Sequence, residues 1–294
     1  MISRGTADAS PRRGLSPVWL MLFAVALVVA PFLFWKGTWF GRALNDDEMA
    51  RYLADRDKPR HVQHALSQIA DRIVRGDQSV EKWYPRVIEA SFSPLREIRS
   101  TAAWVMGQDS RNQRFHAALA SLLTDREPMV KRNAAVSLVR FQDGRGKPVL
   151  VEMLTPYPVQ APQAGRFTPR LKEGDPVNVG TLLGRLAAAS GEPLEVRSPV
   201  PGEVRAIAAG AETQPGDELA RIAPNPDQVW EALRALYLVG DAGDLPEVQR
   251  YARPVDGMPE RIQQQARLTA GAIRSRSQEQ GAGSREQGVR SPEP

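Results

Sequence analysis

The sequence predicts a multidomain α + β protein. It has a membrane-spanning helix near its N-terminus, an array of paired helices, and a small all-β module inserted into that array. Three observations support this prediction. An apolar run begins at Pro17, a helical pattern of apolar residues recurs along the chain, and a strand-rich segment from Val159 to Pro224 repeats itself.

The composition is that of a globular protein and excludes several kinds of site. The chain has 294 residues, of which 42% are hydrophobic and 25% charged, so wholesale disorder is excluded. It contains no cysteine, which excludes disulfides, thiolate metal sites and a cysteine nucleophile. The formal net charge is +5, but the arginines are scattered without a basic run, so no nucleic-acid partner is expected.

Residues 17–36 predict a transmembrane anchor. The run from Pro17 to Trp35 has no charged residue and approaches the ~20 residues that span a bilayer as a helix. Arginines before the run favour a cytoplasmic N-terminal tail, residues 1–16, and a periplasmic or extracytoplasmic body. We therefore expect a single-pass protein of the inner (cytoplasmic) membrane. The alternative is a cleaved signal peptide, but cleavage after Ala30 would leave the apolar residues from Pro31 onward exposed.

From 44 to 156 the chain predicts short helices in pairs. Apolar residues at i, i+4 and i+8 mark one helix face, and equivalent faces recur at a spacing of 32, where Ile98 corresponds to Val130 and Ala102 to Ala134. The helices expected between these faces, and those expected after the β segment, are Glu48–Ala54, Val80–Ser91, Asn112–Leu123, Lys147–Leu154, Gln228–Val239, Pro246–Tyr251 and Pro259–Ile273.

The segment Pro128-Met129-Val130-Lys131-Arg132-Asn133-Ala134-Ala135 resembles the HEAT family of helical repeats. The resemblance implies an α-solenoid of HEAT-like helix pairs over 44–156 and 225–276, in which each unit buries its apolar face against its neighbours. It also implies a concave surface that binds proteins, and it does not by itself imply catalysis. A plain α-helical bundle is the alternative.

The segment 159–224 predicts two similar sets of strands. Val159 to Phe167 matches Val196 to Val204 at an offset of 37, and glycines mark equivalent turns in the two halves. Two such halves can close one small sandwich. Its expected core is Phe167, Val177, Leu183, Leu186, Val196, Val204, Leu219 and Ile222.

This segment resembles the biotinyl/lipoyl family, whose fold is a barrel-sandwich hybrid. The residues that carry the likeness are Ala161-Pro162-Gln163-Ala164-Gly165, Leu171-Lys172-Glu173-Gly174-Asp175, Arg197-Ser198-Pro199-Val200-Pro201-Gly202 and Gly216-Asp217-Glu218-Leu219. Carrier members hold biotin or lipoate on a lysine at the hairpin between the halves. Here residues 186–196 contain no lysine, and Lys172 lies in a turn. The resemblance therefore implies a non-carrier member. Such members occur in membrane fusion proteins, but the long coiled-coil hairpin of those proteins is missing.

The β module interrupts the helical array, and the stiff proline junctions at Tyr157-Pro158 and Pro224-Asn225-Pro226 favour a fixed projection. Two independent domains on flexible linkers are the alternative. The polar residues 277–294 predict a disordered tail.

Two clusters could bind a cation. His61 and His64 are three residues apart, a spacing that allows metal binding, but no third ligand is evident and surface positions explain them. The run Asp46-Asp47-Glu48 follows Asn45, and a helix N-cap at Asn45 or Asp46 with acids in the first turn explains it. We therefore predict no catalytic, cofactor-binding or metal-binding residue, no cofactor and no enzyme activity.

Together these features predict a membrane-anchored, non-catalytic scaffold or adaptor that binds protein partners in an envelope complex for respiration, transport or secretion. The alternative is a biotin- or lipoyl-type carrier, or an accessory subunit of a larger enzyme, which the missing lysine disfavours.

Overall fold

The computed structural model describes Val25, Leu27 and residues 43–188, 191–208, 210 and 212–288. The chain divides into two compact units, residues 1–50 and 51–294. In the first unit, Asn45 caps the helix α2 (Asp46–Ala54). The Asn45 side chain accepts from the backbone N–H of Glu48, and the Glu48 carboxylate accepts from the N–H of Asn45. This reciprocal cap accounts for the acidic run without a bound cation.

The predicted transmembrane anchor is corrected by the structure. In the part of the chain that is described, no helix combines the length and the apolar character that a bilayer span requires. The longest helix, α11 (Glu260–Gly288), is rich in Gln, Arg and Glu. The prediction of a single-pass inner-membrane protein with a periplasmic body is corrected with it. The predicted segment 17–36 itself lies outside the described residues, except for Val25 and Leu27.

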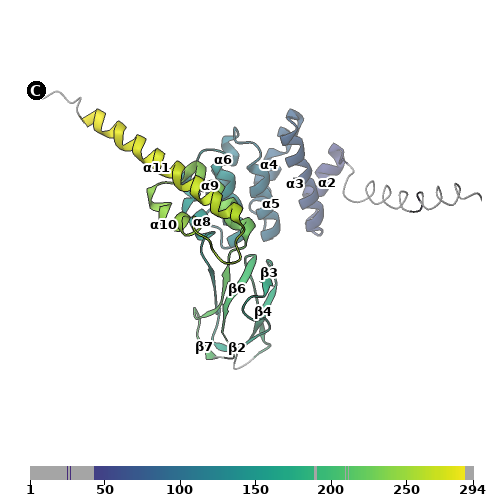
Figure 1. The fold of residues 1–294 in the computed structure, drawn as a ribbon. Coiled ribbons are helices and arrows are strands. Elements are labelled where there is room, and N and C mark those ends of the chain that lie inside the picture. The colour runs from purple at the N-terminus through teal and green to yellow at the C-terminus, as the bar shows by residue number, and fades with distance from the viewer. Residues whose placement is uncertain are drawn as a thin grey trace, which may run out of the picture. The chain divides into compact units, whose positions relative to one another are not determined.

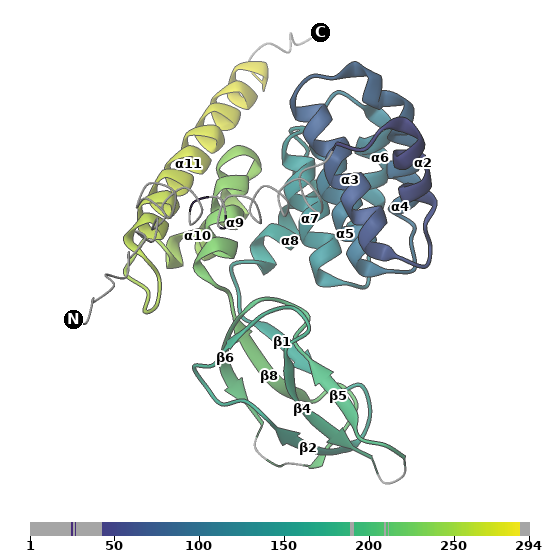
Figure 2. The same ribbon diagram turned by 90° about the vertical axis from the view of Figure 1, so that its right-hand side faces the viewer.

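The helices of the second unit form two rows. The inner row contains α3, α5, α7, α9 and α11, in which each helix packs on the next, and the outer row contains α4, α6, α8 and α10. Figures 1 and 2 show this order along the array. The bounds of these helices are α3 Pro59–Val74, α4 Tyr84–Ala90, α5 Arg96–Met106, α6 Gln113–Leu122, α7 Pro128–Val139, α8 Lys147–Glu152, α9 Pro226–Val239 and α10 Leu245–Arg250, with 3₁₀ turns η2 Gln78–Trp83, η3 Gly144–Gly146 and η4 Ala242–Asp244.

The repeated apolar slots lie in the core, as predicted. Ile98, Ala102, Val130 and Ala134 are all buried, and α5 packs directly on α7. The small alanine side chains allow the two backbones to approach closely. One predicted helix differs: Val80–Ser91 divides into η2 and α4, because Pro85 stands in the first turn of α4 and proline favours a helix start over a helix interior.

The β module lies between α8 and α9 and contains two antiparallel sheets, in the orders β1-β8-β6-β3 and β5-β4-β2-β7. All eight residues of its predicted core are buried, and they pack in one cluster. The strands are β1 Tyr157–Gln160, β2 Gly165–Pro169, β3 Pro176–Val177, β4 Leu182–Ala187, β5 Leu194–Arg197, β6 Gly202–Ile207, β7 Glu212–Thr213 and β8 Glu218–Ala223.

Both halves of the internal repeat contribute strands to both sheets. Each sheet takes its two central strands from one half of the repeat and its two edge strands from the other half. The prediction of a barrel-sandwich hybrid is corrected here: the described strands form two open four-stranded sheets without a closed barrel. The physical reason is that the edge strands β3 and β7 are two residues long, and each pairs on one side alone.

The helices on the two sides of the β module share one apolar core. Leu150 of α8, Leu233 of α9 and Ala266 of α11 belong to a single buried cluster, so the array continues across the insertion. The sequence predicts a disordered tail from 277, and in the structure α11 continues through this stretch to Gly288. Gln, Glu, Arg and Ala, which favour helix, outnumber the glycines in this stretch. Residues 289–294 lie outside the described part.

Candidate functional site

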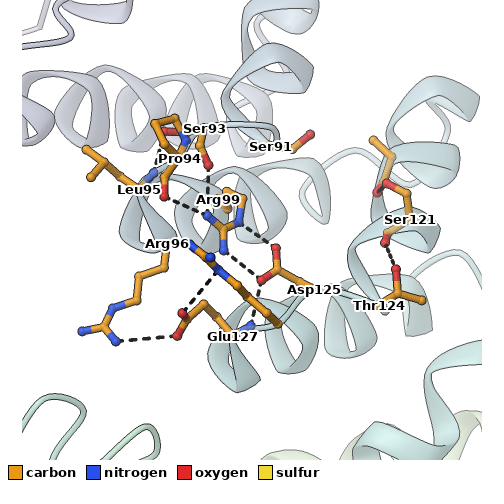
Figure 3. Close-up of polar contacts among 12 residues, drawn as sticks. Ser91, Ser93, Pro94, Leu95, Arg96, Arg99, Ser121, Thr124, Asp125 and Glu127 are labelled. Atoms are coloured by element: carbon orange, nitrogen blue, oxygen red, sulfur yellow. Dashed lines mark hydrogen bonds and ion pairs between the residues drawn. The ribbon is translucent and has the colours of Figure 1, made fainter. Parts of the chain in front are cut away.

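The step from α5 to α7 is closed by a buried ion pair (Figure 3). Arg99 of α5 and Asp125, in the turn before α7, meet through two hydrogen bonds of 2.6 and 2.9 Å. Both side chains are only 9% exposed. The remaining Arg99 nitrogen donates to the carbonyl oxygens of Ser93 and Pro94, at 3.0 and 3.2 Å. The guanidinium is therefore bonded on every nitrogen, as a buried cation requires.

The electrostatics of this pair follow from its geometry. The hydrogen bonds to Asp125 raise the pKa of Arg99. Burial alone would raise the pKa of Asp125, but the hydrogen bonds and charge of Arg99 outweigh burial and lower that pKa below its ordinary 3.8. Each group thus stabilises the charged form of the other.

Polar contacts along the helices reinforce the same step. The Ser137 hydroxyl of α7 donates to the carbonyl oxygen of Ala103 at 2.9 Å, and the Asn133 amide donates to the Ser100 hydroxyl at 2.8 Å. Gly107, at the end of α5, leaves room for Ser137: a Cβ atom at Gly107 would lie 2.5 Å from the Ser137 Oγ atom. The α5–α7 contact is therefore close over its whole length.

The next step, from α7 to α9, is open. Ala135 and Val139 of α7 share a buried cluster with Leu233 and Leu236 of α9, but the chain leaves the array between the two helices to build the β module. A cavity of about 900 Å³ lies at this step. Residues of α7, α9 and α11 line it, together with Pro201 of the β module. The volume is within the range of ligand-binding pockets.

Arg132 of α7 lies in the wall of this cavity, and its burial is not matched by partners. The residue is 5% exposed, and its Nη1 atom is buried without a hydrogen-bond partner among the described residues. Burial lowers the pKa of Arg132 to about 10, against the opposing charges of Tyr157, Glu152 and Glu231. The guanidinium still carries its charge at neutral pH.

Gln228, in the first turn of α9, presents a second unpartnered group in the same wall. It is 8% exposed, and its Nε2 atom donates to the carbonyl oxygen of Met153 at 3.1 Å. Its Oε1 atom is buried and has no partner among the described residues. Asn225 caps α9 by accepting from the Gln228 backbone N–H at 2.9 Å, which fixes the start of the helix. Two residues of the cavity wall thus each carry a buried polar atom, one donor and one acceptor, without a partner among the described residues.

The remaining wall combines charges with an apolar rim. Glu231 faces the cavity, where the surrounding protein raises its pKa and the charge of Arg132 works in the other direction. Trp230 lies under the Arg261 guanidinium at 5.8 Å. The rim includes Leu238 and Leu268, which are each 61% exposed. Such an arrangement can bind a ligand that is both polar and apolar.

The residues that the sequence singled out lie elsewhere. His61 Nδ1 is 2.7 Å from the Asp55 carboxylate, and its ring stacks on Tyr52 at 4.3 Å. His64 contacts Gln68 at 3.1 Å. Within the described residues, no group of three or more His, Cys, Asp or Glu side chains could hold a metal ion. The two histidines share a helix and both lie beside Tyr52, but their hydrogen-bond partners differ.

Lys172 is an ordinary turn residue of the β module. Its backbone N–H donates to the Asp175 carboxylate at 2.9 Å, and the turn continues through Gly174 at φ +88°. The connection between β4 and β5 contains no lysine in its sequence. The likeness of this module to the biotinyl/lipoyl family remains a prediction from the sequence.

Sequence reasoning did not find Arg132 or Gln228 as site residues. Arg132 falls inside the repeat motif, next to Lys131, where an arginine is expected on the helix surface. Its burial depends on α9, which follows the whole β module in the chain. The only signal was a charged residue two positions before an alanine pair.

Two solved structures that resemble this chain share little sequence identity with it. No curated protein matches the sequence. A solved aspartoacylase family protein of Mesorhizobium loti is 20% identical, over 33% of this chain and 32% of that protein, with a TM-score of 0.22. This chain thus spans about a third of that protein's length. An engineered protein is 13% identical, over 77% of this chain and 79% of its own, with a TM-score of 0.40.

One family model matches the helical array. The model of HEAT repeats matches residues 85–161, from α4 to the end of β1. This match agrees with the stacked helix pairs and with the resemblance of the segment 128–135. Residues 85–161 therefore contain HEAT repeats within a helical repeat region, and HEAT repeats suggest a scaffold for protein partners.

Proposed function

We propose that the protein is a non-catalytic scaffold, and that it binds a protein partner at the cavity between α7 and α9. The observation that supports this site is the buried Arg132, whose Nη1 atom has no partner in a cavity of about 900 Å³. This step of the helical array combines the cavity with exposed apolar side chains at its rim, so we expect a partner to bind there.

The chemistry of the cavity suits binding better than catalysis. Its charged lining consists of arginines and two acids, and the two carboxylates have no serine, histidine or lysine beside them in that lining to activate as a nucleophile. The exposed Leu238 and Leu268 lie at its rim. A fixed arginine among apolar side chains is typical of protein interfaces.

Site-specific photo-crosslinking tests this proposal. A photoreactive amino acid at Leu238 of the full chain, in cells of the source organism, should trap a discrete protein partner. The matched control is Phe92, which is 70% exposed and does not line the cavity. A partner trapped equally at Phe92, or none trapped at Leu238, would contradict the proposed site.

A further inference from the structure

The cavity between α7 and α9 contains two buried polar atoms of opposite kind. The Nη1 atom of Arg132 is a charged donor, and the Oε1 atom of Gln228 is a neutral acceptor. Both residues are more than nine-tenths buried, and both line the cavity. An unsatisfied buried group of either kind destabilises the fold. A ligand that supplies one acceptor and one donor would relieve both.

The charge balance selects the acceptor. Three arginines, Arg132, Arg140 and Arg234, line the cavity together with Asp227 and Glu231. Asp227 is paired with Arg261 of α11 at 2.8 Å, so the lining keeps more positive than negative charge, which an anionic group complements. The guanidinium fork of Arg132 also matches the planar geometry of a carboxylate.

The donor that Gln228 requires and the apolar rim both favour a peptide as the source of that carboxylate. A peptide carries backbone N–H groups next to the carboxylate of an acidic residue, so it can supply both the donor for Gln228 Oε1 and the acceptor for Arg132. Beside the two buried groups, the rim presents Tyr237 at 42% exposure and Leu238 and Leu268 at 61% each. These side chains extend the contact beyond a small molecule, and they match an apolar residue next to the acidic one.

We propose that this cavity recognises an acidic residue of a partner peptide. Its Asp or Glu carboxylate binds Arg132, one backbone N–H donates to Gln228, and an adjacent apolar side chain packs on Tyr237, Leu238 and Leu268. The proposal rests on the proposed function, because it states what the scaffold recognises in its partner.

Selection from a random-peptide phage library against the full chain tests this recognition. The expected result is enrichment of peptides with an Asp or Glu next to an apolar residue. Replacing that acid by its amide in a fluorescent synthetic peptide should weaken binding about 30-fold or more, as expected for truncating one partner of a buried charge pair.

Variants of the protein assign the effect to one residue. Arg132→Met should weaken the acidic peptide by a similar factor and should make binding insensitive to the acid-to-amide change. Arg132→Lys, which keeps the charge but loses the fork, should bind more weakly than the wild type. Arg86→Met is the matched control, since Arg86 is an exposed arginine that does not line the cavity. We expect a change of about threefold or less there.

Several results would overturn the inference: no enriched peptide, enriched peptides without an acid, or equal binding by Arg132→Met. Circular dichroism of each variant shows whether it is folded, and Arg132→Lys provides the test if Arg132→Met does not fold. The crosslinking at Leu238 is independent of these readouts. A partner trapped there without acid recognition would retain the proposed function and reject the recognition chemistry, whereas no trapped partner would reject the proposed site itself.

Discussion

Two buried arginines in neighbouring repeats differ in their hydrogen bonding. Arg99, at the closed α5–α7 step, is bonded by Asp125 and two carbonyl oxygens. Arg132, at the open α7–α9 step, is equally buried but leaves Nη1 without a partner among the described residues. The first is a structural cation whose ligands belong to the fold. The second lacks such a ligand within the described fold, and we propose that a partner supplies it. The comparison separates what holds the array together from what the array offers to a partner.

Removing the carboxylate at the closed step gives the largest expected effect. Asp125→Ala should lower the free energy of unfolding by about 3 kcal/mol, because it leaves Arg99 buried and uncompensated. Chemical denaturation measures the change. The matched control is Glu89→Ala, whose ion pair with Arg86 is exposed and should contribute less than about 0.5 kcal/mol. Equal losses for the two variants would mean that the Arg99 pair is not a structural element.

Forcing the closed step apart gives the next largest effect. Gly107→Ala places a Cβ atom 2.5 Å from the Ser137 Oγ atom and should lower the free energy of unfolding by about 2 kcal/mol. The thermal midpoint should fall accordingly.

The control for Gly107→Ala is Gly271→Ala in α11, where an added Cβ atom meets nothing within 4 Å. There the alanine should stabilise the protein by up to about 1 kcal/mol through helix propensity. The second variant Gly107→Ala/Ser137→Gly should recover part of the lost stability. A single variant as stable as the wild type would show that the step tolerates opening.

At the α7–α9 step we expect the effect on the free energy of unfolding to have the opposite sign. Arg132→Met should leave the free energy of unfolding unchanged or raise it by about 1 kcal/mol, because it replaces an unpaired buried charge by an apolar side chain of similar length. Chemical denaturation again measures the effect. A loss above about 2 kcal/mol would contradict the assignment, since it would mean that the fold itself satisfies Arg132.

Lowering the pH should also weaken the Arg99–Asp125 pair, with a smaller effect on the free energy of unfolding than the substitutions above. The lowered pKa of Asp125 means that its contribution is complete above the unfolded value of about 3.9 and is lost as the pH falls through the folded value. Stability should therefore decline below pH 4 more steeply in the wild type than in Asp125→Asn.

Glu231 should act in the opposite direction. Its raised pKa means that the folded state binds a proton more tightly, so its contribution falls as the pH rises from about 4.3 through the folded value. Glu231→Gln should remove this decline, and denaturation curves across the pH range measure it. Identical pH profiles for wild type and Glu231→Gln would show that the carboxylate is solvated as in water.

Much of the fold was predictable, because its main features depend on local periodicity. The slots of Ile98 and Val130 repeat at helical spacing, and the match of Val159 with Val196 places equivalent strands. The pairing of Arg99 with Asp125 was not predictable, since it joins residues 26 positions apart through a turn that no motif specifies. The transmembrane prediction finds no support in the described helices, which are short or polar, and the segment 17–36 lies outside them except for Val25 and Leu27.

The candidate site depended on distant contacts and was not predicted. Arg132 and Gln228 belong to helices on opposite sides of the β module, and their shared cavity exists only after the array continues across it. A sequence shows which helix faces are apolar. It does not show how far two such faces stay apart when a second module leaves the chain between them.

The two ends of the β module lie side by side in one sheet. Tyr157, its first strand residue, pairs directly with Ile222 near its last. The chain therefore leaves the helical array after α8 and returns to it before α9 through neighbouring strands. A short linker in place of the module would span this gap, but the cavity wall would lose Pro201.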